Sequence, residues 1–391
     1  MNYILSDGNQ RDSFLPLTFT RPVADIRIGI LTIKEKWEKH LNESLSFKTE
    51  PYLSEKFPLK EASENVVITG NVLPDIDLVK KIKQLKPSEA LYYDNMPVAY
   101  RTASASLEFD TSDYNRVELD YAPLKIEHVW DIFSKNGEAV EADFELLTKG
   151  RKSLPISSTN QVVNPERVFL EEGAKVEFSI LNASTGPIYI GKNAEIMEGC
   201  IVRGGLALCN SAILKMGAKI YGPSTFGPFC KVGGEVNNSV LFAYSNKGHE
   251  GFLGNSVLGE WCNLGADTNT SNLKNNYAEV RLWDYSTEGF AHTGLQFCGL
   301  VMGDHSKCGI NTMLNTGTVV GVSANIFGSG YPRNFVPSFS WGGASGFTTY
   351  LTRKAYEAAS AMMKRRHVDF NAVEEGILNH VFELTKKWRK S

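Results

Sequence analysis

The sequence contains no run of apolar residues that could cross a membrane as a helix, which takes about 20 consecutive residues. Its first residues, Met-Asn-Tyr-Ile-Leu-Ser-Asp-Gly, also lack the basic segment and the apolar run of a secretory leader. Both absences argue against an exported or membrane-spanning protein. We therefore expect the cytoplasm as its compartment.

An excess of either charge is absent as well. The chain has 391 residues, 41 basic and 44 acidic, with a net charge of −3 and no basic run. Proteins that bind nucleic acids or membrane surfaces usually carry a basic patch or stripe. We therefore expect neither nucleic acid nor a membrane as the main partner. The length allows two or three domains with a large core.

Cysteine is scarce, and no pair has the Cys-x-x-Cys spacing of many metal sites. All six cysteines lie between residues 200 and 308. Four of them, Cys200, Cys230, Cys262 and Cys308, fall on the columns of a repeat described next, where a small apolar residue fits. We therefore expect reduced thiols in a core rather than metal ligands.

The most regular feature is an apolar residue at every sixth position between residues 190 and 237. These residues are Ile190, Ile196, Val202, Leu208, Leu214, Ile220, Phe226 and Val232. A second column, four positions later, holds small or modest residues: Ala194, Cys200, Leu206, Ala212, Ala218, Ser224, Cys230 and Val236. Two coincident columns with one period indicate a structural repeat.

The same frame returns on both sides of this stretch after interruptions. It includes Leu170, Val176, Phe252, Leu258, Leu264, Met302, Cys308, Leu314, Val320 and Ile326. Three hexads would form one triangular coil, and coils would stack at the strand spacing of about 4.8 Å with the apolar column inside. Residues 165–335 thus resemble the hexapeptide-repeat, left-handed parallel β-helix family, and the left hand is what this resemblance implies.

The flanking regions lack this period. Residues 1–155 mix strand-like runs with helix-like ones and predict an α/β domain. The strand-like runs are 3–5, 66–69 and 91–93, and the helix-like ones are 32–40 and 78–85. Residues 340–391 predict helices, with Asn371 and Glu374 as a capping box before an apolar stripe of Val373, Ile377, Val381, Leu384 and Trp388. We expect this tail to cover the end of the coil stack or a neighbouring subunit.

The N-terminus carries a glycine loop after the first predicted strand. Residues 5–11 read Leu-Ser-Asp-Gly-Asn-Gln-Arg, followed by Pro-Leu-Thr at 16–18. This resembles a shortened signature of the sugar-1-phosphate nucleotidyltransferase family, in which backbone N–H groups and a cation meet nucleotide phosphates. The resemblance implies that Gly8, Arg11 and Arg21 line a nucleotide pocket.

The same family places an aspartate that holds Mg²⁺ after a buried strand. Here the corresponding residues are Gly70 and Asn71, and asparagine is a neutral, weaker ligand for magnesium. Asp75 or Asp77 could take its place. Magnesium binding thus depends on which side chains the fold brings together.

The most specific match lies between two blocks of the repeat. Residues 245–254 read Ser-Asn-Lys-Gly-His-Glu-Gly-Phe-Leu-Gly, and residues 263–268 read Asn-Leu-Gly-Ala-Asp-Thr. They resemble the acetyltransferase half of the bifunctional N-acetylglucosamine-1-phosphate uridylyltransferase and glucosamine-1-phosphate acetyltransferase family. The resemblance implies that His249 is the catalytic base. It also implies a set that binds the acyl donor and the sugar: Lys231, Lys247, Phe252, Asn263, Ala266 and Asn272.

The chemistry supports this choice of histidine. An amine that attacks a thioester must lose a proton, and imidazole titrates near neutrality. His249 stands between Gly248 and Gly251, where the chain leaves the regular repeat. His292 and His305 lack this context, and we expect each of them to have a structural role.

A long interruption separates Leu264 from Met302. Residues 269–294 include Tyr277, Arg281 and Trp283. Loops that leave a rigid stack often carry binding functions. We expect this one to close over an acceptor or over a neighbouring subunit.

Together these features predict a sugar-nucleotide enzyme. It would transfer an acetyl group from acetyl-CoA to an amino-sugar 1-phosphate and could also couple the sugar phosphate to UTP, as in the synthesis of UDP-N-acetylglucosamine for the cell envelope. The resemblance implies a homotrimer. Two alternatives stay open: a glucose-1-phosphate thymidylyltransferase-like enzyme with a purely structural β-helix, and a non-catalytic scaffold that binds sugar nucleotides.

Overall fold

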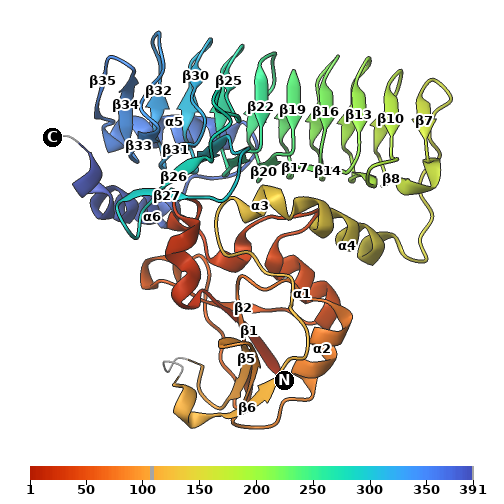
Figure 1. Ribbon diagram of the computed structural model, residues 1–391, viewed down its shortest axis with the longest axis vertical. Coiled ribbons are helices and arrows are strands. Elements are labelled where there is room, and N and C mark those ends of the chain that lie inside the picture. The colour runs from red at the N-terminus through yellow and green to blue at the C-terminus, as the bar shows by residue number, and fades with distance from the viewer. Residues whose placement is uncertain (106–109, 390–391) are drawn as a thin grey trace. The chain divides into compact units, whose positions relative to one another are not determined.

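The computed structural model describes residues 1–105 and 110–389 (Figure 1). The chain forms two compact units. The first unit comprises Met1–Phe14, Thr20–Ile26 and Leu31–Glu127. The second comprises Leu15–Phe19, Arg27–Ile30 and His128–Ser391, so two short N-terminal segments belong to it.

The first unit is built on a mixed six-stranded sheet with the order β2-β1-β3-β5-β4-β6. The strands are β1 (Asn2–Ser6), β2 (Ser46–Lys48), β3 (Asn65–Thr69), β4 (Glu89–Tyr93), β5 (Met96–Thr102) and β6 (Asn115–Glu118). Strands β1, β2 and β3 run parallel, whereas β5 is antiparallel to both of its neighbours. The apolar runs of β1 and β3 are buried because helices pack against the sheet.

Two helices of this unit show why their sequences begin where they do. Helix α1 (Ile33–Leu41) starts with a capping box between Thr32 and Glu35, and α2 (Ile76–Lys83) starts at Asp75, whose carboxylate accepts two backbone N–H bonds. The indole Nε1 of Trp37, on α1, donates to the carbonyl oxygen of Val72 at 2.9 Å. The expected α/β architecture is confirmed.

The second unit is a parallel β-solenoid with three sheets. The first sheet holds β7 (Gln161–Val163), β10 (Ile180–Asn182), β13 (Ile201–Arg203), β16 (Lys219–Tyr221), β19 (Glu235–Asn237) and β22 (Phe252–Gly254). The second sheet holds β8 (Val168–Leu170), β11 (Ile188–Ile190), β14 (Leu206–Leu208), β17 (Ser224–Phe226), β20 (Val240–Leu241), β23 (Val257–Leu258), β28 (Leu300–Met302), β31 (Thr318–Val320) and β33 (Phe335–Val336). The third sheet holds β9 (Lys175–Val176), β12 (Glu195–Ile196), β15 (Ile213–Leu214), β18 (Lys231–Val232), β21 (Asn246–Lys247), β24 (Asn263–Leu264), β29 (Lys307–Cys308), β32 (Asn325–Ile326), β34 (Ser340–Gly343) and β35 (Gly346–Thr349).

The strand register explains the period of the sequence. Ile190 pairs with Leu208, and Leu208 pairs with Phe226, so each partner lies 18 positions further along the chain. Three hexads therefore make one coil, and the apolar columns fill its interior. The parallel β-helix expected from the repeat is confirmed.

Some coils differ in length from this repeat. Phe226 pairs with Leu241, only 15 positions later, whereas Leu258 pairs with Met302 across an insertion. The insertion contains β25 (Asn269–Thr270), which pairs with β30 (Met313–Leu314), and an antiparallel hairpin of β26 (Arg281–Asp284) and β27 (Gly289–His292). After the shorter coil, the inward-facing strand residues no longer lie at multiples of six positions from Ile190.

All six cysteines are free and buried, as expected for core thiols. Burial raises the pKa of Cys230 to about 12. A thiol with such a pKa stays protonated at neutral pH and is a poor nucleophile or metal ligand. The cysteines therefore contribute packing to the solenoid.

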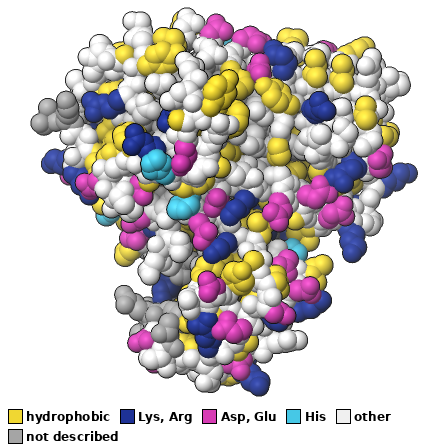
Figure 2. All heavy atoms as spheres, in the orientation of Figure 1, with side chains coloured by type: hydrophobic (Ala, Val, Ile, Leu, Met, Phe, Trp, Pro, Cys, Tyr) yellow, Lys and Arg dark blue, Asp and Glu magenta, His cyan; other side chains and the backbone are white. Residues whose placement is uncertain are grey.

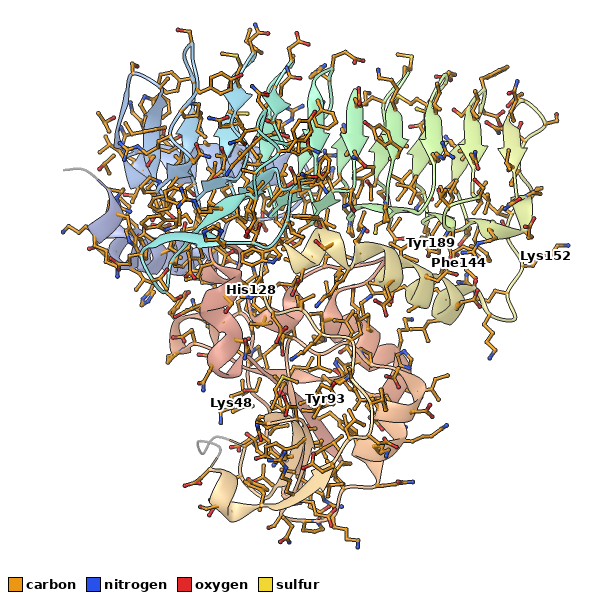
Figure 3. All side chains as sticks on the ribbon, in the orientation of Figure 1. Lys48, Tyr93, His128, Phe144, Lys152 and Tyr189 are labelled. Carbon is orange, nitrogen blue, oxygen red and sulfur yellow. The ribbon has the colours of Figure 1, made fainter. Side chains whose placement is uncertain are left out.

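Helices α3 (Asp131–Ser134) and α4 (Asn136–Thr148) belong to the solenoid unit, and Figure 3 labels Phe144 of α4 and Tyr189 of β11 where this helix meets the second sheet. The buried Asn136 makes the principal polar contact. Its carboxamide oxygen accepts from the N–H of Gly29 at 2.8 Å and from the hydroxyl of Thr225 at 3.1 Å. The segment Arg27–Ile30 is thereby fixed to the solenoid.

The C-terminal region contains helices from Thr352 onward, as expected, whereas residues 340–349, which were expected in the same helical region, form the strands β34 and β35. Helices α5 (Thr352–Lys364) and α6 (Ala372–Leu384) follow the last strand. Asn371 caps α6 by accepting from the N–H groups of Val373 and Glu374, each at 3.0 Å. The short 3₁₀ helices are η1 (Gly8–Phe14), η2 (Leu17–Phe19), η3 (Val23–Asp25), η4 (Pro51–Leu53), η5 (Thr111–Asp113), η6 (Pro165–Arg167) and η7 (Lys386–Trp388).

The surface matches the balanced composition. On the face shown in Figure 2, acidic and basic side chains are interspersed. Within the described residues, no helix is both long and apolar enough to span a bilayer.

Candidate functional site

His249 lies on an exposed turn between two strands of the solenoid. Strand β21 ends at Lys247 and β22 begins at Phe252, so the turn changes from the third sheet to the first. Gly251 has a φ of +112°, and a Cβ there would lie 2.2 Å from the carbonyl oxygen of Thr268. Glycine is therefore required for the close approach of this turn to the next coil, and the imidazole of His249 is left exposed.

This histidine lines an open cleft of about 580 Å³ within the solenoid unit. The other lining residues come from successive coils of the solenoid and from the region of α5: Lys215, Lys231, Tyr244, Asn246, Gly248, Asn263, Leu264, Gly265, Ala266, Ile310, Met362, Arg365 and Arg366. Of the expected acyl-transfer residues, His249, Lys231, Asn263 and Ala266 thus meet in one place. A cleft of this volume can hold a small-molecule substrate.

Two backbone N–H groups of the cleft are available to a ligand. The N–H groups of Gly248 and Ala266 donate no hydrogen bond within the described residues. A Cβ built on Gly248 would meet no atom within 4 Å, so the space beside this peptide is open. Unpaired N–H groups at such a position can stabilise a developing oxyanion.

Four cationic side chains surround the same cleft. Lys215 and Lys231 come from the solenoid, and Arg365 and Arg366 follow the end of α5. Burial and then the nearby Arg366, Lys215 and Arg365 lower the pKa of Lys231. Cations held this close together repel one another unless an anion lies between them, so the cleft is suited to phosphate groups.

The two arginines were not identified from the sequence. The tail was expected to cover the coil stack or another subunit, and its apolar stripe does bury Ile377 and Val381, although Leu384 is 44% exposed. The signal that could have found the arginines is the short stretch Lys-Arg-Arg-His at residues 364–367, which is too short to count as a basic run.

One wall of the cleft is stiffened by stacked aromatic rings. The ring of Tyr244 lies 5.1 Å from that of Phe229 and 4.0 Å from that of Trp261, and the planes are nearly parallel. All three residues have positive φ values near +60°, which places them at the same corner of successive coils. The stack continues to His305, which is buried beside Trp261 with a ring distance of 6.3 Å.

Three of the expected residues do not line this cleft. Lys247 points into the core of the solenoid and is 2% exposed, so it offers no surface to a substrate. Phe252 and Asn272 instead lie together around Gly254 on the first sheet, and Asn272 Nδ2 donates to Asn255 Oδ1 at 2.8 Å. A role for these two residues in substrate binding stays a prediction.

The insertion packs against its own solenoid. Trp283 of the β26–β27 hairpin stacks on Phe335 with a ring distance of 4.1 Å, and Tyr285 contacts the same ring edge-on at 5.6 Å. Tyr277 is 66% exposed, and His292 lies 3.2 Å from Glu279 on the surface. The insertion thus has an anchored base and an exposed rim.

In the first unit, the residues expected around a nucleotide already have protein partners. Arg11 is buried and donates to the hydroxyl of Tyr52 at 2.6 Å, and Arg21 lies 3.4 Å from Asp25. Gly8 has a φ of +51° in the exposed loop after β1. Their role in nucleotide binding stays a prediction.

Asp7 shapes the same loop. Its carboxylate accepts from the N–H of Val23 at 2.7 Å and from the hydroxyl of Thr49, and burial raises its pKa to about 6. A carboxylate that joins three chain segments in this way has a structural reason to be buried.

The residues considered for magnesium already have partners within the protein. Asn71 is 1% exposed, and its Nδ2 donates to the carbonyl oxygen of Ile126 at 2.6 Å. The Asp75 carboxylate caps α2 and accepts from the hydroxyl of Tyr121 at 2.9 Å. Across residues 1–105 and 110–389, no three acidic, histidine or cysteine side chains gather as metal ligands.

Comparison with known proteins extends these observations. Residues 3–152 match the family described as "Sugar nucleotidyl transferase". The "Bifunctional protein GlmU" of Synechococcus elongatus is 28% identical over 153 residues, which are 37% of this chain and 29% of the relative. The "Uncharacterized acetyltransferase YaiX" of Escherichia coli is 25% identical over 143 residues, which are 36% of this chain and 61% of the relative.

The chain therefore spans less than two thirds of either relative. A solved Arabidopsis UDP-N-acetylglucosamine acyltransferase aligns with 55% of this chain and 80% of its own, at 13% identity and a TM-score of 0.25. The family match, the GlmU relatives and the β-solenoid fit the family of bifunctional nucleotidyltransferase–acetyltransferase proteins that the sequence resembles.

Proposed function

We propose that the protein transfers an acyl group from acetyl-CoA to the amine of an amino-sugar 1-phosphate, at the cleft that contains His249. The observation that carries this proposal is the arrangement of the cleft. An exposed histidine, two unpaired backbone N–H groups and four cationic side chains line one space. The relative that is named as an acetyltransferase supports the reaction class.

The reaction needs a base, an oxyanion site and a leaving thiolate. His249 takes a proton from the neutral sugar amine as its nitrogen attacks the thioester carbon. The N–H groups of Gly248 and Ala266 donate to the oxyanion that forms. When the carbon–sulfur bond breaks, the imidazolium returns the proton to the sulfur, and the products are the amide and free CoA.

The cationic residues fit the donor better than the acceptor. CoA carries a pyrophosphate and a phosphomonoester, whereas the sugar carries a single phosphate. The larger negative charge of CoA is matched by the four cations Lys215, Lys231, Arg365 and Arg366. We therefore assign this cluster to CoA, and Asn263, which lines the same cleft as His249, to the sugar.

A second function is favoured by one observation, the family match over residues 3–152. It supports nucleotide binding, and UTP coupling in addition to acyl transfer, through the loop of Gly8, Arg11 and Arg21. The alternatives are a thymidylyltransferase-like enzyme with a structural solenoid and a scaffold without turnover. Saturating UTP or dTTP should raise the melting temperature if this loop binds a nucleotide; an unchanged melting temperature with both would reject it.

The experiment that separates these functions follows two products at once. The protein is incubated with acetyl-CoA, UTP or dTTP, Mg²⁺ and a panel of sugar 1-phosphates, while free thiol and pyrophosphate are measured. The proposal is supported if the wild type releases thiol and His249→Asn does not. The matched control is His292→Asn, because His292 is an exposed histidine outside the cleft. Pyrophosphate alone supports the second function, and neither product supports a scaffold.

The resemblance also leads us to propose a cytoplasmic homotrimer that serves cell-envelope synthesis. Light scattering on the purified protein tests the assembly. A mass three times that of one chain is expected, and a monomer at micromolar concentration would reject it.

A further inference from the structure

One charged residue occupies an interior position of the solenoid. Val232 pairs with Lys247 in the third sheet, and the same inward position of neighbouring coils holds Leu214 and Leu264. Lys247 is 2% exposed and ranks among the largest fully buried side chains. A lysine is thus found where the repeat calls for an apolar residue.

The ammonium of Lys247 is directed to the turn that carries His249. Its Nζ donates to the carbonyl oxygen of His249 at 2.6 Å, and this is its one hydrogen bond to the described part of the chain. Gly234 leaves room for it, because a Cβ there would lie 2.8 Å from Nζ. The contact crosses from the core to the exposed turn.

Stability does not explain this residue. An ammonium that is removed from water and makes one hydrogen bond pays a desolvation cost, and an apolar residue of similar volume usually serves a core as well or better. Methionine would fill the column beside Val232 and Leu264. The benefit of Lys247 must therefore lie in its hydrogen bond to the backbone of His249.

The turn needs such support. It is bounded by Gly248 and Gly251, and glycine has more backbone freedom than any other residue type. The His249 side chain extends into solvent. A misplacement of about 1 Å can cost a catalyst about 100-fold in rate. A fixed carbonyl at position 249 restricts the backbone from which the imidazole projects.

We propose that Lys247 is a positioning residue that holds the His249 turn in its productive geometry. This inference rests on the proposed role of His249 as the base. Lys247 touches no substrate, so its loss should lower kcat and leave the binding of acetyl-CoA unchanged.

The test compares Lys247→Met with a matched variant, Lys307→Met. Lys307 Nζ also donates to a histidine carbonyl oxygen, that of His305, at 2.8 Å, but neither residue lines the cleft. Lys247→Met should lower kcat about 10- to 100-fold, keep KM for acetyl-CoA within about twofold and not lower the melting temperature. Lys307→Met should keep kcat within about twofold of the wild type.

A wild-type kcat in Lys247→Met would overturn the inference, as would an equal loss of kcat in both variants. Hydrogen exchange gives a readout that does not need activity. The peptide covering residues 245–254 should exchange at least about tenfold faster in Lys247→Met, and an unchanged rate would also overturn it. If the wild type releases no thiol, or His249→Asn releases it normally, the proposed function fails, and the exchange result still decides the positioning role.

Discussion

The stability of Lys247→Met relative to the wild type should depend on pH. Burial is the main cause of the low pKa of Lys247, which falls from the ordinary value of 10.5 to about 8. Each pKa unit corresponds to about 1.4 kcal/mol, so the charged lysine lowers the free energy of unfolding by about 3 kcal/mol. Methionine carries no such cost.

The direction follows from the protons bound in each state. Below pH 8 the lysine is charged in both states, and the folded protein bears the whole cost. Between pH 8 and 10.5 the folded protein releases the proton while the unfolded chain keeps it, so the wild type gains stability as the pH rises. The advantage of Lys247→Met should therefore shrink by about 3 kcal/mol across this window.

Urea unfolding of both proteins at pH 7 and pH 10, followed by tryptophan fluorescence, measures this difference. Groups other than position 247 cancel in the comparison of the two proteins. Lys307→Met should show the same trend, because burial also lowers the pKa of Lys307 to about 8. A difference between Lys247→Met and the wild type that stays constant, or grows, from pH 7 to pH 10 would refute the reasoning.

Three other tests probe different parts of the molecule. Gly227→Ala should lower the free energy of unfolding by at least about 3 kcal/mol, since its Cβ would lie 1.5 Å from the Phe242 carbonyl oxygen; an unchanged thermal melt would contradict this. Replacing Arg365 and Arg366 by glutamine should raise KM for acetyl-CoA about tenfold, with kcat kept within about threefold in the thiol assay; an unchanged KM would remove them from the donor site. Ellman's reagent should label none of the six cysteines before unfolding and all of them after it, as every thiol is buried; rapid labelling of the folded protein would show an accessible thiol.

The sequence predicted the solenoid well because its period is a direct consequence of the coil. Ile190, Leu208 and Phe226 stack at intervals of 18 residues, and a stack of this kind requires the same residue type at each turn. His249 was predicted from the resemblance of residues 245–254 to an acetyltransferase family, and it lies where the pattern is interrupted between two glycines. Regularity indicated the fold, and the catalytic role of this interruption stays a prediction.

The six-residue count did not reveal that Lys247 is buried. Val232 and Lys247 are paired although only 15 residues separate them, because the coil between them is three residues shorter than the regular 18-residue coil that joins Ile190 to Leu208. Counting by sixes therefore did not place Lys247 inside, and the family resemblance implied a substrate contact for it. Strand register, which depends on the length of each corner, was needed to show that it faces the core.

Arg365 and Arg366 could not be found from local patterns. They are distant in sequence from His249, and only the course of the chain after α5 brings them to the cleft. In the first unit, by contrast, the sequence around Asp75 was sufficient to predict that this residue caps a helix. An aspartate three residues before an apolar helical run is a typical N-cap, and this use competes with metal binding.

Thiol release from acetyl-CoA in the presence of amino-sugar 1-phosphates is the most direct measurement of the proposed function. Wild-type protein and His292→Asn should release CoA at equal rates with at least one of these acceptors, and His249→Asn should lose at least about 100-fold in kcat. Thiol release by His249→Asn at the wild-type rate, or no release by the wild type with any acceptor, would contradict the assignment of the cleft as an acyltransferase site.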